Sequence, residues 1–117
     1  MTDPTVEFFE GLRGRGHDPA VRNVVASVRF DLLRDGGTER WYLGIRNGDL
    51  SVSLVDSPRP ADCVMTARRA VFDTIAAGGS PMSAMLRGEV TLDGEPEVWI
   101  VCRRLLPEPL RLKGILA

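Results

Sequence analysis

The side chains that most often carry catalysis or bind metals are few and scattered in this sequence. His17 is the only histidine, and it lies in a glycine-rich stretch that is typical of a loop. A histidine metal site usually needs further ligands, so we interpret His17 as a solvated loop residue. Ser80 and Ser83 lie at the start of a predicted helix, where no motif places a base beside either hydroxyl. The sequence therefore predicts no catalytic residues, no metal site and no cofactor, and a protein that is not an enzyme.

Phosphate or nucleic-acid binding is only weakly indicated. Gly14-Arg15-Gly16 is similar to half of a phosphate-binding loop, but no strand precedes it and neither nucleotide-binding spacing follows. The chain carries 15 basic and 16 acidic residues, a net charge of −1. Such a balance gives no overall attraction to a polyanion. Nucleic acid is therefore not an expected partner.

Apolar side chains that adapt their shape are more numerous. Met65, Met82 and Met85 are predicted to face inward around one region, together with Phe30, Phe72, Leu86 and Leu105. Methionine fills irregular spaces and is common where a surface accepts several partners. Periodicity alone favours a filled core. The alternative is a cavity between a sheet and its helices, because pockets of about 300–1,000 Å³ for small apolar ligands have linings of this kind.

Three alternating segments in the first half of the chain predict an antiparallel meander. Two strong turn sequences, at 35–38 and 47–49, separate the segments. Each segment has apolar residues at every second position, so the meander has one apolar face. The residues on that face are Ala26, Val28, Phe30, Leu32, Trp41, Leu43, Ile45, Leu50, Val52 and Leu54.

Helices and short strands alternate in the second half of the chain. Thr66 is predicted to cap the first of these helices, and Gly88 and Gly94 to bracket a strand. The arginine pairs at 68–69 and 103–104 are interpreted as solvated helix faces. The predicted elements are a strand over 62–66, helices over 67–77 and 81–87, a strand over 89–93 and a helix over 96–106.

Length and composition predict one domain in a reducing compartment. A chain of 117 residues has the common size of a single domain. Cys63 and Cys102 lie in apolar surroundings without a paired spacing, as reduced cytosolic thiols do. The sequence shows no secretion signal and no apolar stretch near the roughly 20 residues that span a bilayer. We therefore expect a cytoplasmic protein without a transmembrane segment.

The order of three phrases resembles the sterol carrier protein 2 family, the nonspecific lipid-transfer domains. The phrases are "RWYLGIRNGDLSVSL", "ADCVMTARRAVFDTIAAG" and "SPMSAMLRGEVTLDGEP", of which the last is the most specific. The resemblance covers roughly residues 5 to 106 of a single domain over 1–117. The positions that match the family pattern in the last phrases are Gly78, Pro81, Met82, Gly88, Val90, Leu92 and Gly94.

The resemblance implies an α+β fold: a five-stranded, mainly antiparallel sheet covered on one face by helices. It also implies a hydrophobic tunnel between sheet and helices, which holds a fatty acyl chain, an acyl-CoA or a sterol-like ligand without catalysis. The absence of the family's peroxisomal address fits a bacterial cytoplasm. The candidate ligand-binding residues carried over by position are Phe30, Leu43, Met65, Phe72, Ile75, Met82, Met85, Leu86 and Leu105.

An alternative function is an interaction protein with a closed core. It would be a homodimer or an accessory subunit of an enzyme in a lipid- or quinone-handling system. Its contact would be carried by Trp99, expected to be exposed, or by the apolar tail at 107–117. In a lipid carrier the same tail would plug the mouth of the tunnel.

Overall fold

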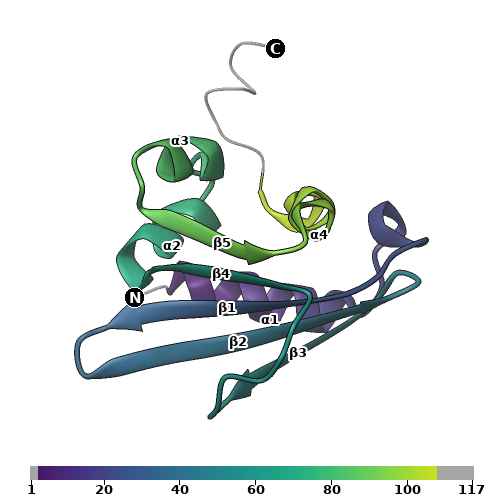
Figure 1. Ribbon diagram of the computed structural model, residues 1–117. Coiled ribbons are helices and arrows are strands. Elements are labelled where there is room, and N and C mark those ends of the chain that lie inside the picture. Colours follow the sequence, from purple (N-terminus) through teal and green to yellow (C-terminus); the bar gives the residue numbers. More distant parts are fainter. Residues whose placement is uncertain (1–2, 108–117) are drawn as a thin grey trace.

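The computed structural model describes residues 3–107, which form a five-stranded sheet with helices packed on one face (Figure 1). The α+β fold expected from the resemblance is confirmed. The predictions for the tail beyond Pro107 lie outside the described residues. The elements in chain order are α1 (Pro4–Arg15), the 3-10 helix η1 (Pro19–Val21), β1 (Val25–Arg34), β2 (Gly37–Arg46), β3 (Asp49–Val55), β4 (Cys63–Arg68), α2 (Arg69–Ala76), α3 (Pro81–Leu86), β5 (Val90–Gly94), α4 (Pro96–Cys102) and the 3-10 helix η2 (Arg103–Leu105).

The strand order of the sheet is β3-β2-β1-β4-β5. Strands β1, β2 and β3 form the predicted meander, and β4 pairs antiparallel with β5. Strands β1 and β4 are parallel, so the sheet is mixed although mainly antiparallel. The β2–β3 turn uses Asn47 at φ 51° and Gly48 at φ 93°, the positive values that an Asn-Gly hairpin turn requires.

Gly88 and Gly94 bracket β5, as the sequence predicts. Both have positive φ, 76° and 121° respectively. A Cβ at Gly94 would overlap the backbone of Asp62, so the end of β5 lies directly against the start of β4. The Glu95 N–H donates to the Asp62 carbonyl at 2.9 Å and fixes the same contact. Strand β5 is thereby held at the edge of the sheet, with α3 before it and α4 after it.

Two helix boundaries differ from the prediction. Strand β4 continues to Arg68, so Thr66 lies within the strand and does not cap α2. The reason is that Thr66 pairs with Asp31 on one side and Thr91 on the other, and this ladder overrides the local capping preference. The last helix also ends earlier, because α4 stops at Cys102 and the chain continues as η2.

The inner face of the sheet is covered by a cluster of aromatic side chains that come from α1, from strands β1 and β2, and from α2. Phe9 of α1 is fully buried and stacks on Trp41 of β2 with ring centroids 4.4 Å apart. It also meets Phe30 of β1 at 5.1 Å and Phe72 of α2 at 5.6 Å. Phe8 closes the cluster with an edge contact to Phe72 at 5.9 Å. The space between the sheet and helices α1 and α2 is therefore occupied by the protein's own rings.

Arg69 joins α1, β2 and α2, and the prediction that it is solvated is wrong. Its guanidinium pairs with Asp73 at 2.6 Å, Asp3 at 2.9 Å and Glu39 at 3.2 Å, and only 13% of the side chain is exposed. Asp3 also caps α1, accepting from the Val6 N–H at 3.2 Å. One side chain therefore ties the starts of two helices to the sheet.

Two of the carboxylates around Arg69, those of Asp3 and Glu39, are held in their ionised forms. The hydrogen bond from Arg69 lowers the pKa of Asp3, outweighing its slight burial. Burial acts to raise the pKa of Glu39, but hydrogen bonds from Trp41 and Arg34 and the charge of Arg69 lower it overall. The hydrogen bond to Asp3 in turn raises the pKa of Arg69, against the effect of its burial. Asp3, Glu39 and Arg69 are thus charged throughout the neutral range.

The connection from β3 to β4 contacts the outer, polar face of the sheet. Arg59 lies over the ring of Tyr42 at 4.4 Å, and the Tyr42 hydroxyl donates to the Pro60 carbonyl at 3.2 Å. At the start of β4, Asp62 accepts from the Ser27 N–H at 2.9 Å. These contacts hold the β3–β4 connection against the sheet. A connection of this length is required because β4 runs parallel to β1.

Both cysteines are unpaired and buried, so we expect them to be unreactive in the folded protein. Burial, with a smaller contribution from the charge of Cys63, raises the pKa of Cys102 to about 12, and burial also raises the pKa of Cys63. Titration with a chromogenic disulfide reagent at neutral pH should find no rapidly reacting thiol in the native protein. It should find both in concentrated guanidinium chloride. Rapid labelling of either native thiol would contradict the burial of these side chains.

Candidate functional site

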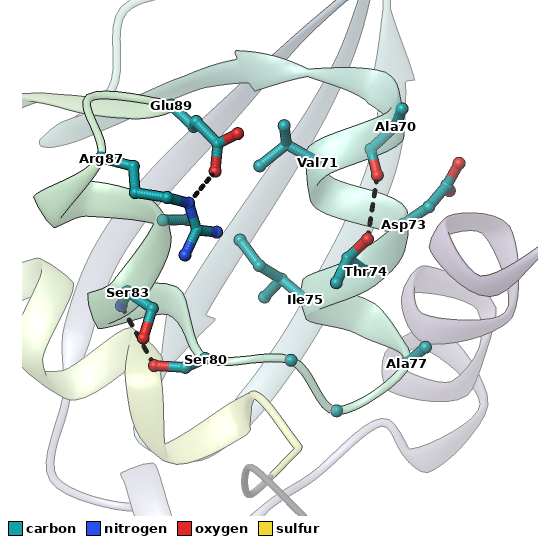
Figure 2. A pocket seen from close by; sticks show the side chains of 13 residues that line it. Ala70, Val71, Asp73, Thr74, Ile75, Ala77, Ser80, Ser83, Arg87 and Glu89 are labelled. Carbon is teal, nitrogen blue, oxygen red and sulfur yellow. Dashed lines mark hydrogen bonds and ion pairs between the residues drawn. The ribbon is translucent and has the colours of Figure 1, made fainter.

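An open cavity of about 860 Å³ lies between α2, α3 and the start of β5. Figure 2 shows Val71 and Ile75 pointing from α2 into this space, toward Arg87 and Glu89 on the opposite side. We call it the α2–α3 cavity. Its lining residues are Ala70, Val71, Asp73, Thr74, Ile75, Ala77, Gly78, Gly79, Ser80, Ser83, Ala84, Arg87 and Glu89.

The floor of the α2–α3 cavity is apolar because α2 has apolar residues on two adjoining faces. Phe72 is fully buried in the aromatic cluster of the core. Val71 is partly buried and Ile75 is 1% exposed, and both line the cavity. Ala84 of α3 is 2% exposed and adds a small apolar surface opposite them. Small residues on α3 leave room between the two helices, and larger ones would close it.

Polar groups at the rim of the α2–α3 cavity are bound to one another. Arg87 pairs with Glu89 at 2.7 Å, and the Ser80 hydroxyl accepts from the Ser83 N–H at 3.1 Å, which caps α3 (Figure 2). Asp73 is held by Arg69, outside the cavity. Each charged side chain of the lining, Asp73, Arg87 and Glu89, already has an ion-pair partner. The cavity therefore offers mainly an apolar surface to a ligand.

The loop from α2 to α3 is set by two glycines. Gly78 has φ 107°, and its N–H donates to the Ile75 carbonyl at 3.0 Å. The Gly79 N–H donates to the Thr74 carbonyl at 2.8 Å, and a Cβ at Gly79 would meet Thr74 at 2.8 Å. The chain therefore turns closely around the end of α2 and starts α3 on the far side of the cavity.

A second cavity, of about 620 Å³, lies between α1, the end of α2 and η2. We call it the α1–η2 cavity. It is lined by both apolar and charged side chains, including two arginines and a glutamate. The lining residues are Pro4, Glu7, Phe8, Gly11, Arg15, Ala76, Ala77, Arg104, Leu105, Leu106 and Pro107.

Seven of the nine sequence-predicted ligand contacts line a cavity or pack in the core. Ile75 lines the α2–α3 cavity and Leu105 lines the α1–η2 cavity. Four others, Phe30, Leu43, Met65 and Phe72, are fully buried in the packed core and line neither cavity. Met85 is partly buried against the core.

The expectation that Met82 and Leu86 face inward is wrong. Met82 is 46% exposed and Leu86 is 82% exposed. The reason is that α3 turns Pro81 and Ala84 toward the protein, which leaves the next positions around the helix in solvent. Whether either residue touches a ligand stays a prediction.

Trp99 is also placed differently from the expectation. It is 5% exposed, packed within the core on α4, whereas Ile100 beside it is 57% exposed. Because α4 packs against β1 and β4, the face of the helix that carries Trp99 is turned into the core. Trp99 therefore cannot serve as the exposed interface anchor that the closed-core alternative used.

The sequence analysis missed Val71, Ala84 and Ser83 as lining residues. Small side chains at 83 and 84 were a usable signal, since a short helix lined with Ser and Ala leaves space beside it. Within residues 3–107, no cluster of three or more histidine, cysteine or carboxylate side chains is suited to a metal. In the same range, no helix has the length and hydropathy needed to cross a membrane.

The fold is shared with solved structures of low sequence identity. Sterol Carrier Protein 2 of Aedes aegypti in complex with palmitate is 23% identical, with a TM-score of 0.64 over 86% of this chain and 92% of that one. The apo form from Yarrowia lipolytica is 24% identical, with a TM-score of 0.59 over 74% and 83%. A search of curated proteins found no match.

A larger protein contains the same fold as one part. The stereoselective inverting sec-alkylsulfatase Pisa1 from Pseudomonas sp. is 22% identical, with a TM-score of 0.67 over 86% of this chain. This chain spans only 16% of the length of that enzyme. The family model of the SCP-2 sterol transfer family matches residues 9–107, which is most of the chain. The chain therefore belongs to the SCP-2 sterol transfer family.

Proposed function

We propose that this chain is a noncatalytic lipid-binding or lipid-carrier module that holds a fatty acyl chain, an acyl-CoA or a sterol-like molecule in the α2–α3 cavity. The observation that carries the proposal is the apolar floor of Val71, Ile75 and Ala84 in a cavity of about 860 Å³. That volume lies within the range of about 300–1,000 Å³ found for small-molecule sites. The related mosquito protein, solved in complex with palmitate, supports the same class of ligand.

Burial of apolar surface supplies the binding energy in this proposal. Each Å² of apolar surface removed from water contributes about 25 cal/mol, so a long acyl chain binds without an ionic contact. Because the rim groups Arg87 and Glu89 are already paired, they add little selectivity. We therefore expect loose selectivity among chains of similar length. Of the sequence-predicted contacts, the proposal uses Ile75, which lines this cavity, and all nine contacts remain predictions.

Filling the cavity tests the proposal directly. Ser83→Trp places an indole into the α2–α3 cavity, and we expect it to weaken the binding of a fluorescent fatty-acyl probe at least about tenfold, since the space is lost. Met82→Trp is the matched control, because Met82 is the preceding residue and does not line the cavity. Circular dichroism and urea unfolding check that both variants fold.

The pair of variants also separates the competing sites. Loss of binding in Met82→Trp alone would move the site to the exposed face of α3 and contradict the proposal. No saturable binding to the wild-type protein would favour the alternative, a homodimeric or accessory module with a closed core. The occurrence of the same fold as 16% of the alkylsulfatase chain supports that alternative. Light scattering of the wild-type protein would then measure its assembly.

A further inference from the structure

The two cavities adjoin at the C-terminal end of α2. Ala77 lines both of them, and Ala76 lines the second. The chain at 76–79 reads Ala-Ala-Gly-Gly, so this segment, where the two linings meet, carries no side chain larger than a methyl group. The C-terminal end of α2 is therefore the place where an extended molecule in the α2–α3 cavity comes nearest to the second cavity.

The two cavities differ in how their charges are paired. In the α2–α3 cavity, Arg87 is neutralised by Glu89 at 2.7 Å. In the α1–η2 cavity, Arg15 is neutralised by Asp18 at 2.6 Å. Arg104 donates one hydrogen bond, to the Ala20 carbonyl at 3.3 Å, and forms no ion pair with any residue between 3 and 107. Among the arginines of the two linings, Arg104 is thus the one without a carboxylate partner within residues 3–107.

We propose that the α1–η2 cavity is the headgroup site for an amphiphile whose apolar chain lies in the α2–α3 cavity. The headgroup is a carboxylate or a phosphate, which Arg104 binds through the remaining N–H groups of its guanidinium. This inference rests on the proposed function and adds the orientation of the ligand. The apolar chain lies in the cavity beside α3, and the charged headgroup lies against η2. Glu7, the carboxylate in the same lining, repels an anion and lowers its affinity for the site.

Matched ligands of one chain length test the assignment. Palmitate and hexadecyl phosphate carry an anionic head, whereas hexadecanol has the same chain without charge. We expect the wild-type protein to bind the two anions about tenfold more tightly than the alcohol in competition with a fluorescent acyl probe, as one charge-assisted contact gives. Inorganic phosphate alone should not displace the probe, because it lacks the chain.

Variants of the lining charges identify the contact. Arg104→Gln should remove the preference for the anions and leave hexadecanol binding unchanged. Glu7→Gln should increase the preference, since it removes the opposing charge. Arg103→Gln is the control, because Arg103 is the neighbouring exposed residue of η2 and does not line the cavity. It should behave as the wild type.

The outcomes separate the two proposals. Equal binding of alcohol and anions, with no response to Arg104→Gln, would overturn the headgroup site while the lipid-binding function stands. Displacement of the probe by inorganic phosphate would mean that Arg104 binds a free anion, and this result would also overturn the headgroup site. Failure of all three amphiphiles to bind would overturn both proposals.

Discussion

Phe9→Ala is expected to destabilise the protein by about 3–5 kcal/mol, the range for removing a fully buried phenylalanine. Phe9 is 0% exposed, stacks on Trp41 at 4.4 Å and touches Phe30 and Phe72. Its removal leaves a void bounded by three rings that come from different elements. Rings fixed on strands and on a second helix cannot collapse far into that void. Urea unfolding followed by tryptophan fluorescence should therefore show a lower midpoint with an unchanged slope.

Phe8→Ala is the control for this experiment. Phe8 is the preceding residue, is only partly buried, and contacts the cluster from its rim. Phe8→Ala should lower the free energy of unfolding clearly less than Phe9→Ala does. A loss below about 1 kcal/mol for Phe9→Ala would contradict the packed aromatic core. It would mean that the space between the sheet and α1 adapts, as the lining of a tunnel would.

Arg69→Met is the second substitution with a large expected effect, about 2–4 kcal/mol. It keeps most of the side-chain volume but leaves the carboxylates of Asp3, Glu39 and Asp73 without their shared cation. Breaking a buried ion pair on one side typically costs about 3–5 kcal/mol, and the 13% exposure of Arg69 reduces that cost. Arg68→Met is the matched control, because Arg68 is exposed and outside the network. It should change the stability by less than about 0.5 kcal/mol.

The effect of Arg69→Met should depend on pH in a defined direction. The pKa values of Asp3 and Glu39 are lowered from their ordinary values of 3.8 and 4.5. A carboxylate whose pKa is lowered in the folded protein stabilises the fold. This contribution is fully present when the pH is above the ordinary pKa, and it is lost as the pH falls through the folded-state pKa. The difference in unfolding free energy between wild type and variant should therefore be full at neutral pH and shrink in acid. A difference that stays constant down to pH 3 would contradict the network.

Period-two patterns allowed the meander of β1, β2 and β3 to be predicted, because each of these strands buries one face and local sequence records that face, whereas the five-stranded sheet was expected from the family resemblance. The role of Arg69 could not be predicted in the same way. Its partners Glu39 and Asp3 lie 30 and 66 residues away, and nothing in the local sequence of an arginine pair distinguishes a solvated helix start from the centre of a network. Thr66 shows the same limit, since neighbouring strands on both sides decide where β4 ends.

The candidate site was harder to predict than the fold. Periodicity identified Phe30, Met65 and Phe72 as inward-facing, which they are. It does not show whether the space they face is filled, and here Phe9 from α1 fills it. The cavity lies further out, along the adjoining face of α2 and opposite α3. Its position depends on how α3 is set by the glycine loop, and a helix of six residues is too short for its pattern to fix which side is buried.

The parallel pairing of β1 with β4 has a consequence for the order of assembly. Ser27 and Asp62, which meet where this pairing begins, are 35 residues apart in the chain, whereas the meander is closed by two short turns. Closing the longer loop costs more chain entropy, so we expect the meander to form early and β4 to dock late in folding. Because α2 continues directly from β4, the α2–α3 cavity, the proposed binding site, exists only after that late step. A bound lipid should therefore slow the unfolding of the finished protein while leaving the rate of its early folding unchanged.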